Sequence, residues 1–149
     1  MKFTEQEELG RTLFFSTQFT NCNLCHDVKG RAGKVEQATF TSYKYFNIGV
    51  PANPDARKLN GSKPDFVDTG LAANPEVNGD PREKGKFKTP SLRNVALTAP
   101  YFHDASAPTL EAAVDIMFRY QLGRIASAQD KSEIIAFLKT LNGKVAGKP

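Results

Sequence analysis

The sequence Cys22-Asn23-Leu24-Cys25-His26 decides how the rest of the chain is interpreted, because it contains the only two cysteines. The pattern C-x-x-C-H is that of covalent c-type haem attachment. Two thiols three residues apart on a helical turn can reach the two vinyl groups at one edge of a porphyrin and form thioethers. His26, directly after the second thiol, is then held with its imidazole facing the iron as the proximal ligand. We therefore predict one haem c, attached through Cys22 and Cys25.

Three other interpretations of the cysteine pair are weaker. A thioredoxin-like redox pair normally follows a strand, whereas the residues before Cys22 indicate a helix and a polar linker over 16–21. A structural zinc site needs four ligands, and beyond the motif the chain offers no cysteine and one further imidazole, His103. A chance match to the pattern is the third alternative.

Length and composition place the motif in one globular domain. The chain has 149 residues, the size of a single ordinary domain, and 40% hydrophobic with 24% charged residues is typical of globular proteins. We predict one domain over 1–149, with a frayed tail at 143–149. The apolar runs are a few residues long, against about 20 for a membrane-crossing helix, so we expect no membrane span. The net charge of +4 comes from basic residues scattered along the chain, which argues against nucleic-acid binding.

Three amphipathic helices are predicted around the motif from apolar spacing and capping residues. The first two are predicted over about 4–15 and 109–122, and the last, which is capped by Ser127 or by Asp130, ends near 141. A capping box at Thr4 and Glu7 starts the first helix, and Gly123 ends the second in a left-handed conformation. For the third, Asn142-Gly143 offers a left-handed stop. We expect the first and last helices to pack against each other beside the haem, with these residues at their contact: Leu9, Leu13, Ile135 and Leu138.

The stretch 30–90 is predicted to be mostly loop. It holds seven of the eleven glycines and six of the nine prolines and shows no helical period. The expected exception is one short strand formed by Tyr43 and Tyr45 with their neighbours Phe40 and Phe46. So long an irregular segment is hard to fit inside a compact domain unless it wraps a large apolar cofactor. The predicted fold class is therefore all-α: a cytochrome c-like helical domain with long loops around one covalently attached haem.

The second axial ligand of the iron can be sought by elimination. The usual choices are methionine, histidine, tyrosine or an open position. The chain has two methionines. Met1 stands at a terminus, so Met117, on the apolar face of the 109–122 helix, is the credible thioether; its other role would be core packing. His103 is the competing ligand, and its alternatives are a hydrogen-bonded loop histidine and a donor to a haem propionate.

Several further stretches carry a family resemblance. They are Leu13–Phe15, Cys22–His26, Phe46-Asn-Ile-Gly-Val-Pro51, the run from Phe87 to Asp104, Thr109-Leu-Glu-Ala-Ala-Val-Asp-Ile-Met117, and Ile135–Leu141. Together they closely resemble the C-terminal haem domain of bacterial di-haem cytochrome c peroxidases, over nearly the whole chain. In that family this domain carries the high-potential electron-transfer haem, and the resemblance implies that Met117 is its distal ligand. The resemblance also places Arg93 and His103 close to the haem, as propionate or electron-path contacts.

The sequence departs from the family in one way that bears on function. A di-haem peroxidase has two C-x-x-C-H sites, and the second, peroxide-reducing haem belongs to an N-terminal domain without a counterpart in these residues. Peroxide reduction needs an open or displaceable coordination position, whereas a His/Met pair fills both. We therefore expect a monohaem cytochrome that carries single electrons. The alternative is a peroxidase-type haem enzyme, or a fragment of a di-haem peroxidase-like one.

The expected partner is a redox protein, with the chain acting as a free carrier or as a domain of a larger multi-haem protein. Thioethers on haem form outside the cytoplasmic membrane in bacteria, so the expected location is the periplasm. The residues Met1–Glu5 lack the apolar segment of a secretory signal, and we expect the sequence to be a mature or excised chain.

Overall fold

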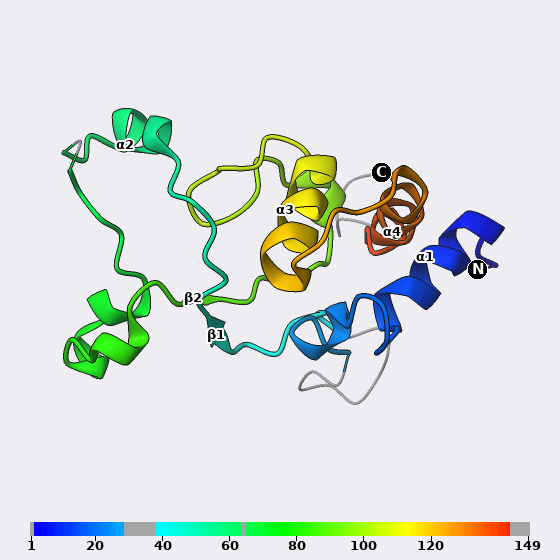
Figure 1. The fold of residues 1–149 in the computed structure, drawn as a ribbon, viewed down its shortest axis with the longest axis horizontal. Coiled ribbons are helices and arrows are strands. Elements are labelled where there is room, and N and C mark those ends of the chain that lie inside the picture. The colour runs from blue at the N-terminus through cyan, green and yellow to red at the C-terminus, as the bar shows by residue number, and fades with distance from the viewer. Residues whose placement is uncertain (1, 29–37, 64, 144–149) are drawn as a thin grey trace.

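The computed structural model describes residues 2–28, 38–63 and 65–143. Within these ranges the helices are α1 (Glu5–Phe15), α2 (Pro54–Asn60), α3 (Leu110–Leu122) and α4 (Ala128–Thr140). Two short strands, β1 (Tyr45–Phe46) and β2 (Phe87–Lys88), pair in antiparallel fashion, with Tyr45 opposite Lys88. Single 3₁₀ turns lie at Cys22–Leu24, Leu71–Ala73, Pro75–Val77, Pro81–Glu83 and Val95–Leu97. The fold is thus mostly helical with long loops, as predicted (Figure 1).

Local sequence explains where α1 and α3 begin and end. The Thr4 hydroxyl accepts the Glu7 N–H, and the Glu7 carboxylate accepts the Thr4 N–H at 2.7 Å, so the predicted capping box is present. Thr109 caps α3 by accepting from the N–H of Ala112. Gly123, at φ +66°, ends α3 in the predicted left-handed conformation.

The end of α4 differs from the prediction. The N–H of Leu141, at φ −78°, donates back to the carbonyl of Leu138, which closes the helix without a left-handed residue. Gly143 is not in the left-handed region. Its N–H donates instead to Oδ1 of Asn94 at 2.8 Å, a tertiary contact that the local sequence does not reveal.

Helix α2 lies inside the segment predicted as loop. The Asn53 side chain accepts the Asp55 N–H at 3.0 Å, and Pro54 occupies the first position, where no N–H is needed. Gly61, at φ +73°, ends the helix. The sequence therefore held both a start and a stop signal, but a helix of seven residues is too short to show an apolar period.

Helices α1 and α4 cross at close range (Figure 1). Gly10 lies so near the main chain of α4 that a Cβ atom there would be 1.8 Å from the carbonyl oxygen of Glu133. Phe14, 2% exposed, packs on Phe137 with ring centroids 5.2 Å apart. The predicted contact between the terminal helices is present, but Gly10 and Phe14 make its centre. Leu9, predicted at the contact, is 44% exposed.

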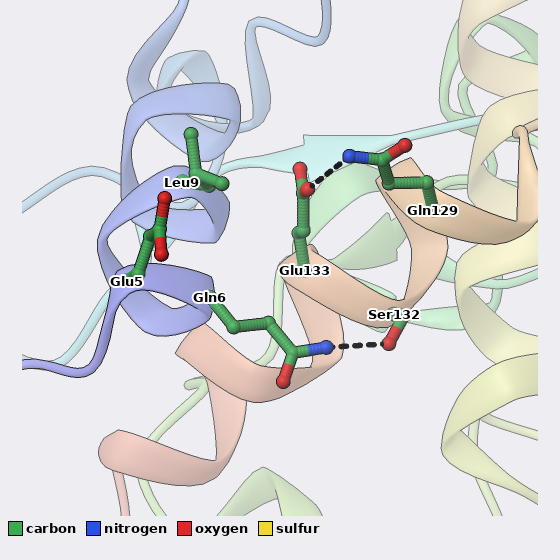
Figure 2. Close-up of a pocket in the computed structure, with 6 residues that line it drawn as sticks. All are labelled: Glu5, Gln6, Leu9, Gln129, Ser132 and Glu133. Atoms are coloured by element: carbon green, nitrogen blue, oxygen red, sulfur yellow. Dashed lines mark hydrogen bonds between the residues drawn. The ribbon is translucent and has the colours of Figure 1, made fainter.

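A shallow groove runs beside this contact, between the first turns of α1 and α4 (Figure 2). The Gln6 amide donates to the Ser132 hydroxyl at 2.7 Å across it. Within α4, the Gln129 amide donates to Glu133 at 2.9 Å. Four of the groove's polar side chains are therefore bonded in two pairs, and Leu9 also lines the groove.

One hydrophobic core joins the three long helices to the loops. Its buried members are Phe14, Ala38, Phe40, Leu92, Val95, Leu110, Val114, Phe118, Ile134, Ile135, Phe137, Leu138 and Leu141. Cys22 and Val28 are partly buried against this core, so the C-x-x-C-H turn lies at its edge. Within the described ranges, no helix has the length and apolar character needed to cross a membrane.

Candidate haem-binding site

Cys22, Cys25 and His26 lie on one turn of the chain. The N–H groups of Cys25 and His26 both donate to the carbonyl of Cys22, at 3.3 and 3.0 Å. Asn21, left-handed at φ +53°, precedes the turn. Both thiols are free. The turn therefore presents two sulfurs three residues apart, the spacing that attachment to one porphyrin edge requires.

The imidazole of His26 is oriented by a backbone carbonyl. Nδ1 lies 3.1 Å from the carbonyl oxygen of Phe40. A carbonyl can only accept, so Nδ1 carries the proton, and the lone pair on Nε2 is left to bind a metal. Burial lowers the pKa of His26, opposed by the carbonyls of Phe40 and Pro90. A lowered pKa keeps the ring neutral at pH 7, as a metal ligand must be.

The raised pKa values of the two thiols argue against a redox disulfide pair. Burial raises the pKa of Cys22, partly offset by a hydrogen bond with Thr20. Burial also raises the pKa of Cys25, against the opposing charge of Lys44. A thiol–disulfide catalyst needs a lowered pKa on its attacking sulfur. Neither sulfur of this turn has one.

Two segments distant in sequence run together over the motif. The Ser42 N–H donates to the Cys25 carbonyl at 2.7 Å, which ties the 38–46 segment to the turn. The buried Thr41 hydroxyl donates to the Thr89 carbonyl at 2.7 Å, and the Thr89 N–H donates to the Lys44 carbonyl at 2.8 Å. The pairing of β1 and β2 continues this contact. The segment 87–93 therefore supports the loop that orients His26.

Arg93 lies at the end of this 87–93 segment and contacts the loop that orients His26. Its Nε–H donates to the carbonyl of Ala38 at 2.6 Å, and its guanidinium carbon is 5.2 Å from the centre of the Phe40 ring. The structure thus brings Arg93 to the residue whose carbonyl holds His26. Its role as a propionate or electron-path contact stays a prediction.

His103 is exposed and stacks on Phe87 of β2, with ring centroids 3.5 Å apart and planes 13° from parallel. The loop that carries it is fixed to the start of α2. Asp104 accepts the N–H of Asn53 at 2.8 Å and the N–H of Ser106 at 3.1 Å, and the Asn53 amide donates to the Asp104 carbonyl at 3.0 Å. His103 is therefore placed between β2 and α2 by the neighbouring carboxylate.

We expect Asp104→Asn to lower the free energy of unfolding by about 1 kcal/mol, because an amide cannot accept both main-chain N–H groups as well as a carboxylate does. Burial raises the pKa of Asp104, but hydrogen bonds from Asn53 and Ser106 outweigh it and hold the pKa below its usual value. A depressed folded-state pKa means that this stability is complete above about pH 4 and is lost as the pH falls further.

Urea unfolding at pH 7 and at pH 3 measures both effects. The matched control is Asp65→Asn, at an exposed carboxylate, which should leave unfolding unchanged. Equal losses for Asp104→Asn at the two pH values would contradict the assignment.

Met117 is partly buried on α3, the helix that contributes Val114 and Phe118 to the core. Cys22 packs against the same core. The chain just after α3 is also tied to the loop before the motif, since Arg124 Nη2 donates to the Phe19 carbonyl at 2.6 Å. The helix carrying Met117 and the C-x-x-C-H turn are therefore connected on two sides.

The chemistry of this donor set fits a haem c. The turn supplies two thiols and a neutral imidazole with its lone pair on Nε2, and α3 supplies a soft thioether; these are the group types that bind haem iron and its vinyl edge. Across residues 2–28, 38–63 and 65–143, no three His, Cys, Asp or Glu side chains are grouped so as to hold a metal ion.

Sequence reasoning missed two contributors to the site. The carbonyl of Phe40 reaches His26 because Phe40 is left-handed, at φ +52°, and no sequence signal marks such a conformation in a phenylalanine. Arg124 follows the helix-ending Gly123, where a cation beside the last carbonyls is common, but its partner Phe19 is 105 residues away.

Two known proteins are similar in sequence to most of this chain. The methylamine utilization protein MauG of Paracoccus denitrificans (strain Pd 1222) is 44% identical over 119 residues, which cover 80% of this chain and 30% of MauG. The cytochrome c peroxidase Ccp of Escherichia coli (strain K12) is 36% identical over 140 residues, 94% of this chain and 26% of the relative. The chain is homologous to the di-haem cytochrome c peroxidase and MauG family. No family model matches the sequence.

Solved structures of this peroxidase and MauG family share the fold. A single-residue variant of the diheme peroxidase BthA from Burkholderia thailandensis E264 superposes with a TM-score of 0.79 at 26% identity, covering 95% of this chain and 43% of BthA. The fold matches a cytochrome c domain of the di-haem peroxidases. The chain spans less than half the length of each of these relatives.

Proposed function

We propose that this chain is a haem c domain that passes single electrons between redox partners. Cys22 and Cys25 would hold the haem covalently, with His26 and Met117 as axial ligands. The observation that carries the proposal is the orientation of His26, whose Nδ1–H donates to the Phe40 carbonyl, so that the lone pair is on Nε2, on the same turn as two free thiols. When bound, such a haem supplies reversible one-electron chemistry at iron.

The role of the protein is to fix these ligands in both oxidation states. The main chain holds His26 from two sides, through its own turn and through Phe40. Met117 stands on a 13-residue helix anchored in the core, so its position does not depend on a loop. Ligands that move little on electron transfer suit a carrier, because reorganisation of the surroundings opposes the transfer.

We expect Met117→Leu to abolish the weak absorption band that a methionine ligand gives with ferric iron, and to lower the midpoint potential, because a thioether favours the ferrous state. Leucine keeps the size of the side chain but has no donor atom. Absorption spectra and a potentiometric titration of the purified holoprotein measure both changes.

The control is Val114→Ala, which removes buried volume from the same helix without touching the sulfur. It should keep the band. An unchanged spectrum in Met117→Leu would remove Met117 from the iron, and His103 would then be tested as the ligand in the same way.

A peroxidase-type haem enzyme, or part of one, is the second candidate. It is favoured by the relatives, among which are the cytochrome c peroxidase Ccp and a cytochrome c551 peroxidase from Pseudomonas aeruginosa. Rapid peroxide turnover, or immediate cyanide binding by the ferric protein, would favour this candidate over the carrier. The proposed location of either is the periplasm, where c-type haem attachment takes place in bacteria.

A further inference from the structure

We propose that Arg93 is a positioning residue that fixes the hydrogen bond on the axial ligand His26. The inference rests on the proposed haem attachment and adds a role to the predicted propionate or electron-path contact of this residue. Two backbone carbonyls act on the His26 imidazole, those of Phe40 and Pro90. Arg93 belongs to the segment of Pro90 and, among the residues that join the two segments, its side chain contacts the residues next to the Phe40 carbonyl.

The side chain of Arg93 contacts the first segment, residues 38–40, at two points. Its Nε–H donates to the Ala38 carbonyl at 2.6 Å, two residues before Phe40. Its guanidinium lies over the Phe40 ring, 5.2 Å from the centroid. A planar guanidinium can stack and donate at once, which a lysine ammonium cannot do in the same geometry.

The main chain of Arg93 belongs to the second segment. Its N–H donates to Oγ of Ser91 at 3.1 Å, and the Ser91 hydroxyl donates to the Thr39 carbonyl at 2.7 Å. The turn that begins at Pro90 is thereby bonded to the residue just before Phe40. Ser91 and Arg93 therefore both connect the segment that begins at Pro90 to the segment that contains Phe40.

The backbone of Phe40 depends on these contacts of Ser91 and Arg93 because its conformation is unfavourable. At φ +52° it occupies the left-handed region, which a bulky L-residue adopts only when its surroundings hold it there. Its ring is 5% exposed and contacts Phe14 and Phe137, with centroids 6.2 and 6.3 Å away. The core fixes the ring, and Arg93 fixes the adjoining backbone whose carbonyl faces His26.

The contacts of Ser91 and Arg93 affect how strongly the His26 imidazole can donate through Nε2. A carbonyl that accepts Nδ1–H makes the imidazole a stronger donor through Nε2, which stabilises ferric iron and lowers the midpoint potential. If Arg93 no longer held Ala38 and Phe40, the left-handed residue would relax and the hydrogen bond would weaken. The expected consequence is a higher potential.

The test uses holoprotein of the full chain with Arg93→Lys and Arg93→Gln. We expect both variants to move the Nδ1–H proton resonance of His26 in the ferrous state upfield and to speed its exchange with water, and we expect Arg93→Lys to raise the midpoint potential. Arg93→Lys keeps the positive charge, so a shift in this variant cannot come from loss of charge. Ser91→Ala, which removes the hydrogen bond to the Thr39 carbonyl, should shift the same resonance in the same direction.

The chain offers a control in Arg11 of α1, which carries the same side chain away from the motif. Its Nε–H donates to the Glu8 carboxylate at 3.0 Å. Arg11→Lys should leave the His26 Nδ1–H resonance unchanged.

The outcomes separate this inference from the function on which it rests. A wild-type chain whose intact mass lacks haem would remove the proposed function. A wild-type chain that carries haem, with an Nδ1–H resonance that stays the same in Arg93→Lys and Arg93→Gln, would overturn the role of Arg93 alone. A change in potential without a change in this resonance would also overturn it, since it would indicate an effect of charge.

Discussion

Replacing Cys22 and Cys25 together by alanine should abolish covalent haem in protein made by cells that attach haem c. The two thiols are the only cysteines of the chain, so no other sulfur can form the thioethers. His26 still offers Nε2 in this variant, and any haem it binds is held by coordination alone. Intact mass under denaturing conditions distinguishes the two cases, because coordinated haem dissociates and thioether-linked haem stays with the polypeptide.

Leu24→Ala is the matched control for the cysteine variant. Leu24 lies on the same 3₁₀ turn and is 66% exposed, so its truncation should leave one haem on the chain. A wild-type chain with the bare polypeptide mass would contradict haem attachment. Under those conditions the zinc and disulfide interpretations would return, with metal analysis and thiol titration to separate them.

The parts of the site that sequence could predict are those in which residue type and spacing carry the chemistry. Two cysteines and a histidine in C-x-x-C-H admit few uses, and the structure places them on one turn. Thr4 with Glu7, and Thr109 with Gly123, likewise mark helix ends by local hydrogen bonding, and both predictions are confirmed.

The parts that sequence could not predict depend on backbone conformation and on contacts between distant residues. Phe40 reaches His26 through a left-handed conformation that nothing in its residue type suggests. Arg93 was placed near the haem by resemblance, but its contacts with Ala38 and Phe40 span more than 50 residues. Gly143 does not take the predicted left-handed conformation, and its N–H donates to Asn94, which is far away in sequence.

The contact between α1 and α4 shows the limit of hydrophobic patterning. The apolar spacing on α1 pointed to Leu9, yet the residue at closest approach is Gly10, which a hydrophobic pattern ignores. Two helices can approach most closely where one of them has no side chain. The face that packs is therefore set by a missing Cβ atom and by Phe14 one turn later, and Leu9 is left to line the groove.

Gly10→Ala should therefore lower the free energy of unfolding by about 3 kcal/mol, near the upper end for overpacked positions. A Cβ atom there would lie 1.8 Å from the Glu133 carbonyl oxygen, 2.5 Å from its carbon and 3.0 Å from Cβ of Phe137. Two of these atoms are main chain, so no side-chain rotation can relieve the overlap and the helices must separate. Alanine's better helix propensity returns only about 1 kcal/mol of the loss. Equilibrium unfolding in guanidinium chloride measures the difference.

Gly143→Ala supplies the control, because the same substitution there meets nothing closer than Oδ1 of Asn94 at 3.9 Å, an ordinary contact, and Gly143 is not left-handed. Its effect should stay within about 0.5 kcal/mol. The haem spectrum of Gly10→Ala should match that of the wild type at low temperature, because the C-x-x-C-H turn is held by its own main chain and by Ser42 rather than by α1 alone. If Gly10→Ala were as stable as Gly143→Ala, the close crossing of α1 and α4 would be wrong, and with it the arrangement that seals the core beside the site.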